Sequence, residues 1–448
     1  MIQDSRSRPQ PQLTVFDAVV IMVGMVVGIG IFRTPSIVAS NVGSEWMFIL
    51  AWVFGGLVTL VGALCYAELS AANPHAGGEY HFLSRAYGKA CAMLFGWARC
   101  TVIQTGAIAA VAFILGDYLS LLAPLGPYGP ALYAALAVAI LTAVNVIGTS
   151  HGKNLQIVVT LIEIGAVAAI ILFGFFNSGG SAAPAAPAMA PEGAALGMAM
   201  IFVLLTYGGW NEAAYLTGEL NDAPRNIARV LVMGTLILVT LYVLANLALL
   251  SILGLDGIRA SDAVAADMMR AVAGPAGEVT VTLAIVVAAI STLNATIFTG
   301  ARVFYAMAND MTVMRWLGVW DGRGRTPANG LVAQGAIALA LIGLGAFTRD
   351  GFKAMVDYTA PVFWFFLLMV GVSLFVLRRR HPDRVLPYRV PFYPVTPAIF
   401  CLMCLYMLYS SVMYTGTAGL MGLAVLAAGT PLLLFRKTRE AAAATTTD

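Results

Sequence analysis

Three glycines, Gly24, Gly28 and Gly30, lie within seven residues of each other in the first long apolar segment. A glycine costs about 1 kcal/mol relative to alanine inside a helix, so the segment favours a break. In a membrane, a break is tolerated where the freed backbone groups are buried or line a cavity. The N–H groups after the break could bind a carboxylate, and the C=O groups before it an ammonium. That is the polarity of an α-amino acid; the alternative is close helix packing through small residues.

A second candidate break lies five apolar segments later, at Tyr207-Gly208-Gly209-Trp210-Asn211-Glu212. Taken alone, a Gly-Gly pair in a span is usually a packing feature. Two interrupted segments at matching positions in successive groups of five indicate an inverted repeat with a substrate site near the middle of the membrane. The pair of breaks therefore predicts a transporter more strongly than either break does.

The composition sets the class of protein. The chain has 448 residues, of which 60% are hydrophobic and 10% charged, whereas a soluble domain carries about 25% charged residues. This predicts an all-α polytopic membrane protein, and the polar start of the chain has no secretory signal peptide. Twelve segments are long enough to span: 15–38, 46–69, 90–122, 129–148, 154–176, 194–218, 229–254, 277–307, 328–347, 352–377, 393–414 and 416–435.

The positions of Lys and Arg predict the orientation, because cytoplasmic loops carry an excess of both. Most of the 25 lie on one side if the N-terminus is cytoplasmic. We therefore expect a protein of the inner membrane with both termini in the cytoplasm. The expected parts are a cytoplasmic tail (1–14), a first repeat of five helices (15–176), an extracytoplasmic linker (177–193), a second repeat (194–377), helices eleven and twelve with the preceding basic loop (378–436) and a cytoplasmic tail (437–448).

Five motifs occur in order along the chain: Gly28-Ile29-Gly30-Ile31-Phe32, Tyr66-Ala67-Glu68-Leu69 with Gly77-Gly78-Glu79-Tyr80, Tyr207-Gly208-Gly209-Trp210-Asn211, Phe298-Thr299-Gly300-Ala301-Arg302 and Arg389-Val390-Pro391. They resemble the motifs of the amino acid–polyamine–organocation superfamily. The resemblance is nearest to its L-type amino acid transporter branch and that branch's bacterial relatives, and it runs from Asp17 to Arg436. It implies a LeuT-like fold with twelve helices, a five-plus-five inverted repeat, broken helices one and six, and alternating access.

The same resemblance implies a substrate site built on the two breaks. The substrate carboxylate would be bound by the N–H groups of Ile29, Gly30 and Ile31, next to Gly28. Its ammonium would be bound by backbone carbonyls, those of Met25, Leu205, Tyr207 and Gly208. The pocket for the substrate side chain would be formed by Gly24, Leu205, Trp210 and Asn294.

Several residues depart from the family pattern. Ile29 replaces a serine, and Leu205 replaces an aromatic gate. The loop 123–130 lacks the cysteine that pairs relatives with a glycoprotein subunit, so we expect no disulfide-linked heavy subunit. Glu163 stands where many relatives carry a lysine, and an ionisable group at that depth is a functional candidate. It could exchange a proton during transport, or be a structural glutamate.

Two more charged residues allow alternatives. Glu212, just after the second break, could attract a substrate ammonium or a cationic side chain, or fix the second half-helix to a neighbour. Arg99, within a span, is expected to pair with an acid or with backbone carbonyls. Glu163 and Glu212 are thus the two candidates for coupling.

These observations predict a secondary transporter of amino acids, with neutral ones as the first choice, working as an exchanger or a proton symporter. Cationic amino acids or amines are one alternative, and a sensor that binds without transport is another. No nucleophile–base arrangement supports an enzyme. His75, Glu79 and His81 lack a fourth ligand for a metal. We expect no cofactor and no nucleic acid, and as partners the amino acid, the lipid bilayer and, for a symporter, protons.

Overall fold

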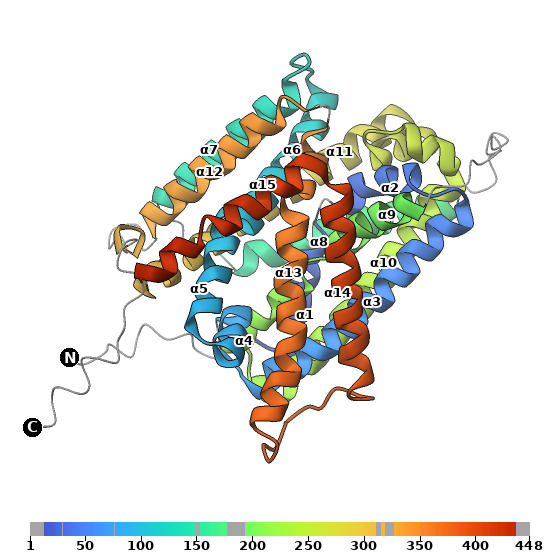
Figure 1. Cartoon of the computed structure of the whole chain (residues 1–448). Helices are drawn as coiled ribbons and strands as arrows, with labels where there is room; N and C mark the ends of the chain where they lie inside the picture. The colour runs from blue at the N-terminus through green and yellow to red at the C-terminus, as the bar shows by residue number, and fades with distance from the viewer. Residues whose placement is uncertain are drawn as a thin grey trace, which may run out of the picture.

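Helices make up all the regular secondary structure that the structure describes (Figure 1). The structure is a computed structural model, and it describes residues 13–28, 30–75, 77–147, 153–176, 193–310, 315–318, 327–348 and 350–435. The predicted linker at 177–193 and the C-terminal tail at 437–448 lie outside these ranges, apart from residue 193, as does most of the N-terminal tail at 1–14.

The first half of the chain contains the first break and a long helix with a π-helical turn. Its elements are α1 (Val15–Val26), α2 (Gly30–Ser40), α3 (Glu45–Ala72), α4 (Gly78–Tyr87), α5 (Lys89–Ala98), the π-helical turn η2 (Arg99–Ile103), α6 (Gln104–Leu122), α7 (Gly129–Ile147) and α8 (Lys153–Phe176).

The second half contains the second break and the longest helices. Its elements are α9 (Gly193–Thr206), the 3-10 segment η3 (Trp210–Gly218), α10 (Ala223–Ala260), α11 (Val264–Asp310), η4 (Arg315–Gly318), α12 (Ala328–Gly345), α13 (Gly351–Arg380), α14 (Val395–Tyr414), α15 (Gly416–Ala427) and η5 (Thr430–Phe435).

Length and apolar composition identify the membrane spans. Among the residues described, nine helices can each cross a bilayer, and α1 with α2 forms a tenth span that is bent by 47° at its break. α9 and α15 are apolar but shorter, at 14 and 12 residues. The helical composition and these spans confirm the prediction of an all-helical, multi-pass membrane protein.

Both predicted breaks are present, and they meet each other. The first separates Val26 from Gly30, and the second separates Thr206 from Trp210. Gly209 in the second break has φ +103°, which glycine adopts without strain. A Cβ atom there would lie 3.1 Å from the carbonyl oxygen of Met25 in the first break. The two unwound segments therefore cross at close range.

The other helices surround these crossing segments. α7 and α12 lie side by side at one edge of the molecule, and α3 packs along α10 at the other (Figure 1). Between them, α8 packs against α1 so closely that a Cβ on Gly24 would lie 2.0 Å from the Thr160 hydroxyl oxygen. The breaks are thus enclosed within the helical bundle.

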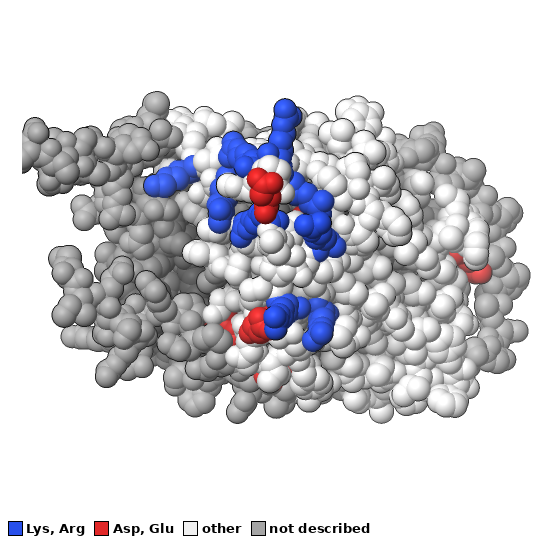
Figure 2. All heavy atoms as spheres, turned by 90° about the horizontal axis from the view of Figure 1, so that it is seen from below, with Lys and Arg blue, Asp and Glu red and all other residues white. Residues whose placement is uncertain are grey.

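One end of the molecule carries a strong concentration of basic side chains. It includes Arg378, Arg379 and Arg380 at the last turn of α13, and Arg85 in α4 (Figure 2). The sequence predicts the cytoplasmic side for these residues. The face is consistent with one dominant orientation in the membrane.

The close crossing of α6 and α7 gives a test of this packing. Gly116 in α6 would place a Cβ only 2.1 Å from the backbone oxygen of Pro130, which cannot rotate away. We expect Gly116→Ala to destabilise the protein by about 1–3 kcal/mol through overpacking. Gly165→Ala is the control, because its Cβ would have no atom within 4 Å. Thermal unfolding of the purified protein in detergent should show a lower midpoint for Gly116→Ala alone, and equal midpoints would contradict the crossing.

Candidate functional site

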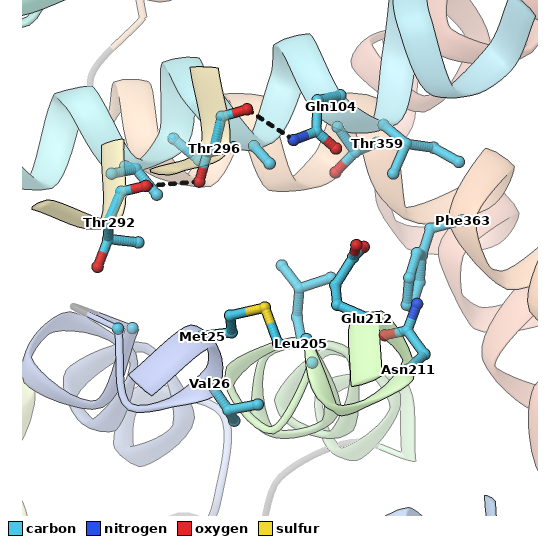
Figure 3. Close-up of a pocket in the computed structure, with 18 of the residues that line it drawn as sticks. Met25, Val26, Gln104, Leu205, Asn211, Glu212, Thr292, Thr296, Thr359 and Phe363 are labelled. Carbon is cyan, nitrogen blue, oxygen red and sulfur yellow. Dashed lines mark hydrogen bonds between the residues drawn. The ribbon is translucent and has the colours of Figure 1, made fainter. Parts of the chain in front are cut away.

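A cavity of about 300 Å³ lies where the two breaks meet (Figure 3). On one side it is bounded by α1, α2, α9 and η3, and on the other by α6, α11 and α13. In Figure 3, Met25, Val26 and Leu205 lie below the open space, and Gln104, Thr292 and Thr296 lie above it. A cavity of this size suits a small molecule.

Most of the predicted backbone site borders this cavity. The lining includes six of the predicted residues, namely Gly24, Met25, Gly28, Gly30, Leu205 and Gly208. α2 begins at Gly30, so the N–H groups of Gly30 and Ile31 lie in its first turn, where helical N–H groups have no intrahelical acceptor. The Leu205 carbonyl accepts a hydrogen bond from Gly208 N–H (2.9 Å) and retains a second lone pair.

Other predicted residues lie elsewhere. The Tyr207 side chain is buried away from the cavity and donates to the backbone oxygen of Trp52 (3.1 Å). The Ile31 side chain is buried and outside the lining as well. Ile29 lies outside the described residues. Only the backbone groups of Tyr207 and Ile31 were predicted to bind substrate.

Two predicted pocket residues are not brought to the cavity. Trp210 turns the other way, because its ring fills a space against Tyr66, with ring centroids 4.8 Å apart, and against Phe400. The Asn294 side chain faces α7, where its oxygen accepts a hydrogen bond from Asn145 (2.7 Å). The prediction of these two side chains as pocket residues is corrected: both pack between helices.

Arg99 is the centre of a buried ionic cluster at one end of the cavity. Its Nη2 donates to both oxygens of Glu212 (2.5 and 2.7 Å), and its Nη1 donates to Glu79 (3.2 Å). Glu79 also accepts from Tyr66 (2.7 Å), Asn211 (2.9 Å) and Tyr215 (3.1 Å). Arg99 therefore pairs with acids, as one interpretation of the sequence predicted, and both Glu79 and Glu212 border the cavity.

Glu163 is fully buried beside the cavity wall. Its Oε1 lies 3.4 Å from the hydroxyl of Thr292, and Thr292 lines the cavity. Its Oε2 has no hydrogen-bond partner, and no cation of the described residues lies within 4 Å of the carboxyl. The structure thus separates Glu163 from the substrate space by one side chain.

The sequence reasoning missed the polar wall opposite the breaks. Thr292, Thr296 and Thr299 of α11 line the cavity together, with Gln104 of α6 and Thr359 of α13. The Gln104 amide nitrogen donates to the Thr296 backbone oxygen (2.9 Å), which joins α6 to α11. The spacing of the three threonines places them on one helical face, and this spacing in an apolar segment was the available signal.

A second arginine cluster lies at the other end of the cavity, away from the basic end of the molecule. Arg33 of α2 is buried, with Asp350 at 3.0 Å, Asp262 at 3.3 Å and Asp117 at 3.9 Å. Asp350 directly precedes α13, whose last turn carries the basic face. The helices α2, α6 and α13 also contribute residues to the cavity lining, namely Thr34, Ile114 and Phe352.

Comparison with known proteins decides the family. The sequence profile described as "Amino acid permease" matches residues 13–427. The chain belongs to this family. The permease is 29% identical to the serine/threonine exchanger SteT of Bacillus subtilis (strain 168), over 95% of this chain and 96% of that protein.

Two mammalian relatives agree with this assignment. The mouse b(0,+)-type amino acid transporter 1 is 29% identical over 90% of this chain and 83% of that protein. The human large neutral amino acids transporter small subunit 2 is 27% identical over 92% of this chain and 78% of that protein. The resemblance to the superfamily is confirmed, as are amino acid transport as the activity and the prediction that the permease is not an enzyme.

The Arg99 cluster can be tested by removing its charges in turn. Arg99→Gln leaves the buried Glu79 and the partly buried Glu212 without a cation, and we expect a loss of about 3–5 kcal/mol in stability. Adding Glu212→Gln removes one of those carboxylates, so the double variant should recover part of the loss. Thermal unfolding midpoints of the two single variants and the double variant measure this coupling. Strictly additive effects would show that the two side chains do not act together.

Proposed function

We propose that the permease exchanges neutral amino acids across the cytoplasmic membrane by alternating access. The observation that carries the proposal is the crossing of the two breaks at one cavity. There the carboxylate of the substrate would be bound by N–H groups at the start of α2, those of Ile29, Gly30 and Ile31. Its ammonium would be bound by the carbonyls of Met25, Leu205, Tyr207 and Gly208.

The pairing of Glu212 with Arg99 favours neutral substrates over cationic ones. Glu212 was the residue expected to attract a cation, but both of its oxygens are engaged by Arg99. A cationic substrate would have to compete with a guanidinium held in bidentate geometry. Cationic amino acids are therefore the second choice, and a sensor that binds without transport is third.

The proposed architecture follows the family pattern. Twelve spans would form two inverted repeats, 15–176 and 194–377, followed by two further helices. The basic face in Figure 2 would lie in the cytoplasm together with both termini. The Arg33 cluster would then close the extracytoplasmic side of the cavity. We propose no disulfide-linked subunit, because the loop at 123–130 contains no cysteine.

Coupling is proposed to be exchange, with Glu163 as the residue through which a proton could act. Support for exchange comes from the relative that is named a serine/threonine exchanger. Support for Glu163 comes from its burial without a cationic partner among the described residues and from its contact with Thr292. A carboxyl in such a place is either part of the cycle or a fixed structural group.

Uptake into proteoliposomes tests the proposal. We expect a labelled neutral amino acid to enter several-fold faster when the vesicles contain unlabelled amino acid, because each inward step then follows an outward one. Vesicles without internal amino acid, with and without an inward proton gradient, are the comparison. Saturable binding without any flux would contradict transport and favour the sensor.

Glu163→Gln separates the two forms of coupling. We expect this variant to retain exchange and to lose any stimulation by the proton gradient, since glutamine cannot take up a proton. Glu45→Gln is the matched control, because Glu45 is exposed at the start of α3. Gradient stimulation that survives in Glu163→Gln would remove Glu163 from the coupling mechanism.

A further inference from the structure

The threonines that line the cavity present hydrogen-bond acceptors to it. Thr296 donates its hydroxyl proton to the backbone oxygen of Thr292 (2.7 Å), and Thr299 donates to that of Ala295 (2.8 Å). Thr359 and Thr206 likewise donate to carbonyls of their own helices, at 3.1 and 2.8 Å. A hydroxyl has one proton and two lone pairs, so each of these oxygens can still accept.

The cation of the cavity is not available to a substrate. Arg99 is the one Lys or Arg in the described lining, and it is shared between Glu79 and Glu212. The Glu212 side chain is 31% exposed, and Figure 3 shows its carboxyl directed into the open space.

We propose that the cavity selects amino acids whose side chains donate hydrogen bonds, hydroxyl and amide side chains above all, and rejects side chains that carry a carboxylate. This inference rests on the proposed function, because it concerns the side chain of the transported amino acid. A donor side chain meets the oxygens of Thr296, Thr299 and Thr359 on the wall opposite the breaks. A carboxylate meets the same oxygens and the carboxyl of Glu212, with no free cation in the described lining to neutralise it.

The apolar part of the lining does not weaken this inference. Phe352, Phe363 and Ile103 also border the cavity and provide space for a side chain of any polarity. Two side chains of equal shape fill that space equally. The difference between members of such a pair therefore reports the hydrogen bonds alone, which makes isosteric amino acids the right probes.

Competition in proteoliposomes loaded with unlabelled amino acid tests the selection. The labelled substrate is the neutral amino acid that gives the fastest exchange, and the competitors are threonine against valine and glutamine against glutamate. We expect threonine to inhibit at a concentration about tenfold lower than valine, as the loss of one hydrogen bond predicts. Glutamine should outcompete glutamate by more than that, because glutamate also brings a charge.

Variants locate the effect on the cavity wall. Thr296→Val keeps the shape of the side chain and removes its oxygen, so the threonine-to-valine ratio should fall several-fold. Thr296→Ser restores the oxygen and should restore the ratio. Thr240→Val is the matched control, because Thr240 makes the same kind of bond to Leu236 (2.9 Å) on the exposed side of α10. Each ratio is measured within one variant, so expression and stability do not affect it.

The possible results are distinct. Equal inhibition by threonine and valine, or by glutamine and glutamate, would overturn the inference while transport itself stood. A ratio unchanged in Thr296→Val would remove the α11 wall from the selection and overturn the assignment made here. No uptake of any amino acid by the intact protein would instead overturn the proposed function, and the inference with it.

Discussion

An interrupted helix inside a membrane must find partners for the backbone groups that it releases, and this requirement organises the structure. In the hydrocarbon region no water is present to satisfy them. Val26, the last residue of α1, has its carbonyl oxygen bonded by the Tyr242 hydroxyl (2.6 Å). The Leu205 carbonyl receives the Gly208 N–H. Gly28 and Gly208 of the two breaks line the cavity. The proposed substrate, which has a carboxylate and an ammonium, would complement the groups that remain.

The close approach of the two breaks is what makes the cavity one site. Gly209 can face Met25 because it has no side chain and accepts a positive φ. A larger residue would separate the two segments and divide the donor groups from the acceptor groups. The glycines of this chain therefore act mainly by permitting contact between α1 and the segment after α9, and less by adding flexibility.

The two buried arginines follow a similar rule, since each joins elements distant in the sequence. Arg99 connects the π-helical turn to α4 and to the segment after the second break. Arg33 connects α2 to the end of α6 and to the start of α13. Removing one partner of a buried pair costs more than the pair itself contributes. Both clusters lie near the cavity, because Arg99 lines it and Arg33 is adjacent in the chain to the lining residue Thr34.

The sequence was sufficient for the fold class and for both breaks, because hydropathy and glycine spacing are local properties. It was also sufficient to identify Glu163 and Arg99 as ionisable residues within membrane spans, where a charge is energetically unfavourable unless it has a structural or functional role. It could not place the side chains of Trp210, which follows the second break, and of Asn294, which lies in α11, because only the packing against Tyr66 and α7 decides where they turn. Proximity in sequence is a poor guide to the lining of a cavity built from several helices.

The threonines of α11 show most clearly what the structure adds. Their spacing could have identified a polar helical face, yet a polar face alone has no preference for donors or acceptors. That preference depends on where each hydroxyl proton goes, and the carbonyl four residues earlier takes it for both Thr296 and Thr299. Thr292 differs, because its hydroxyl lies toward Glu163. One wall therefore combines oxygens that face the substrate with one hydroxyl that connects the substrate space to a buried carboxyl. The threonines proposed to determine side-chain specificity and the threonine next to the proposed coupling residue therefore lie on the same face of α11.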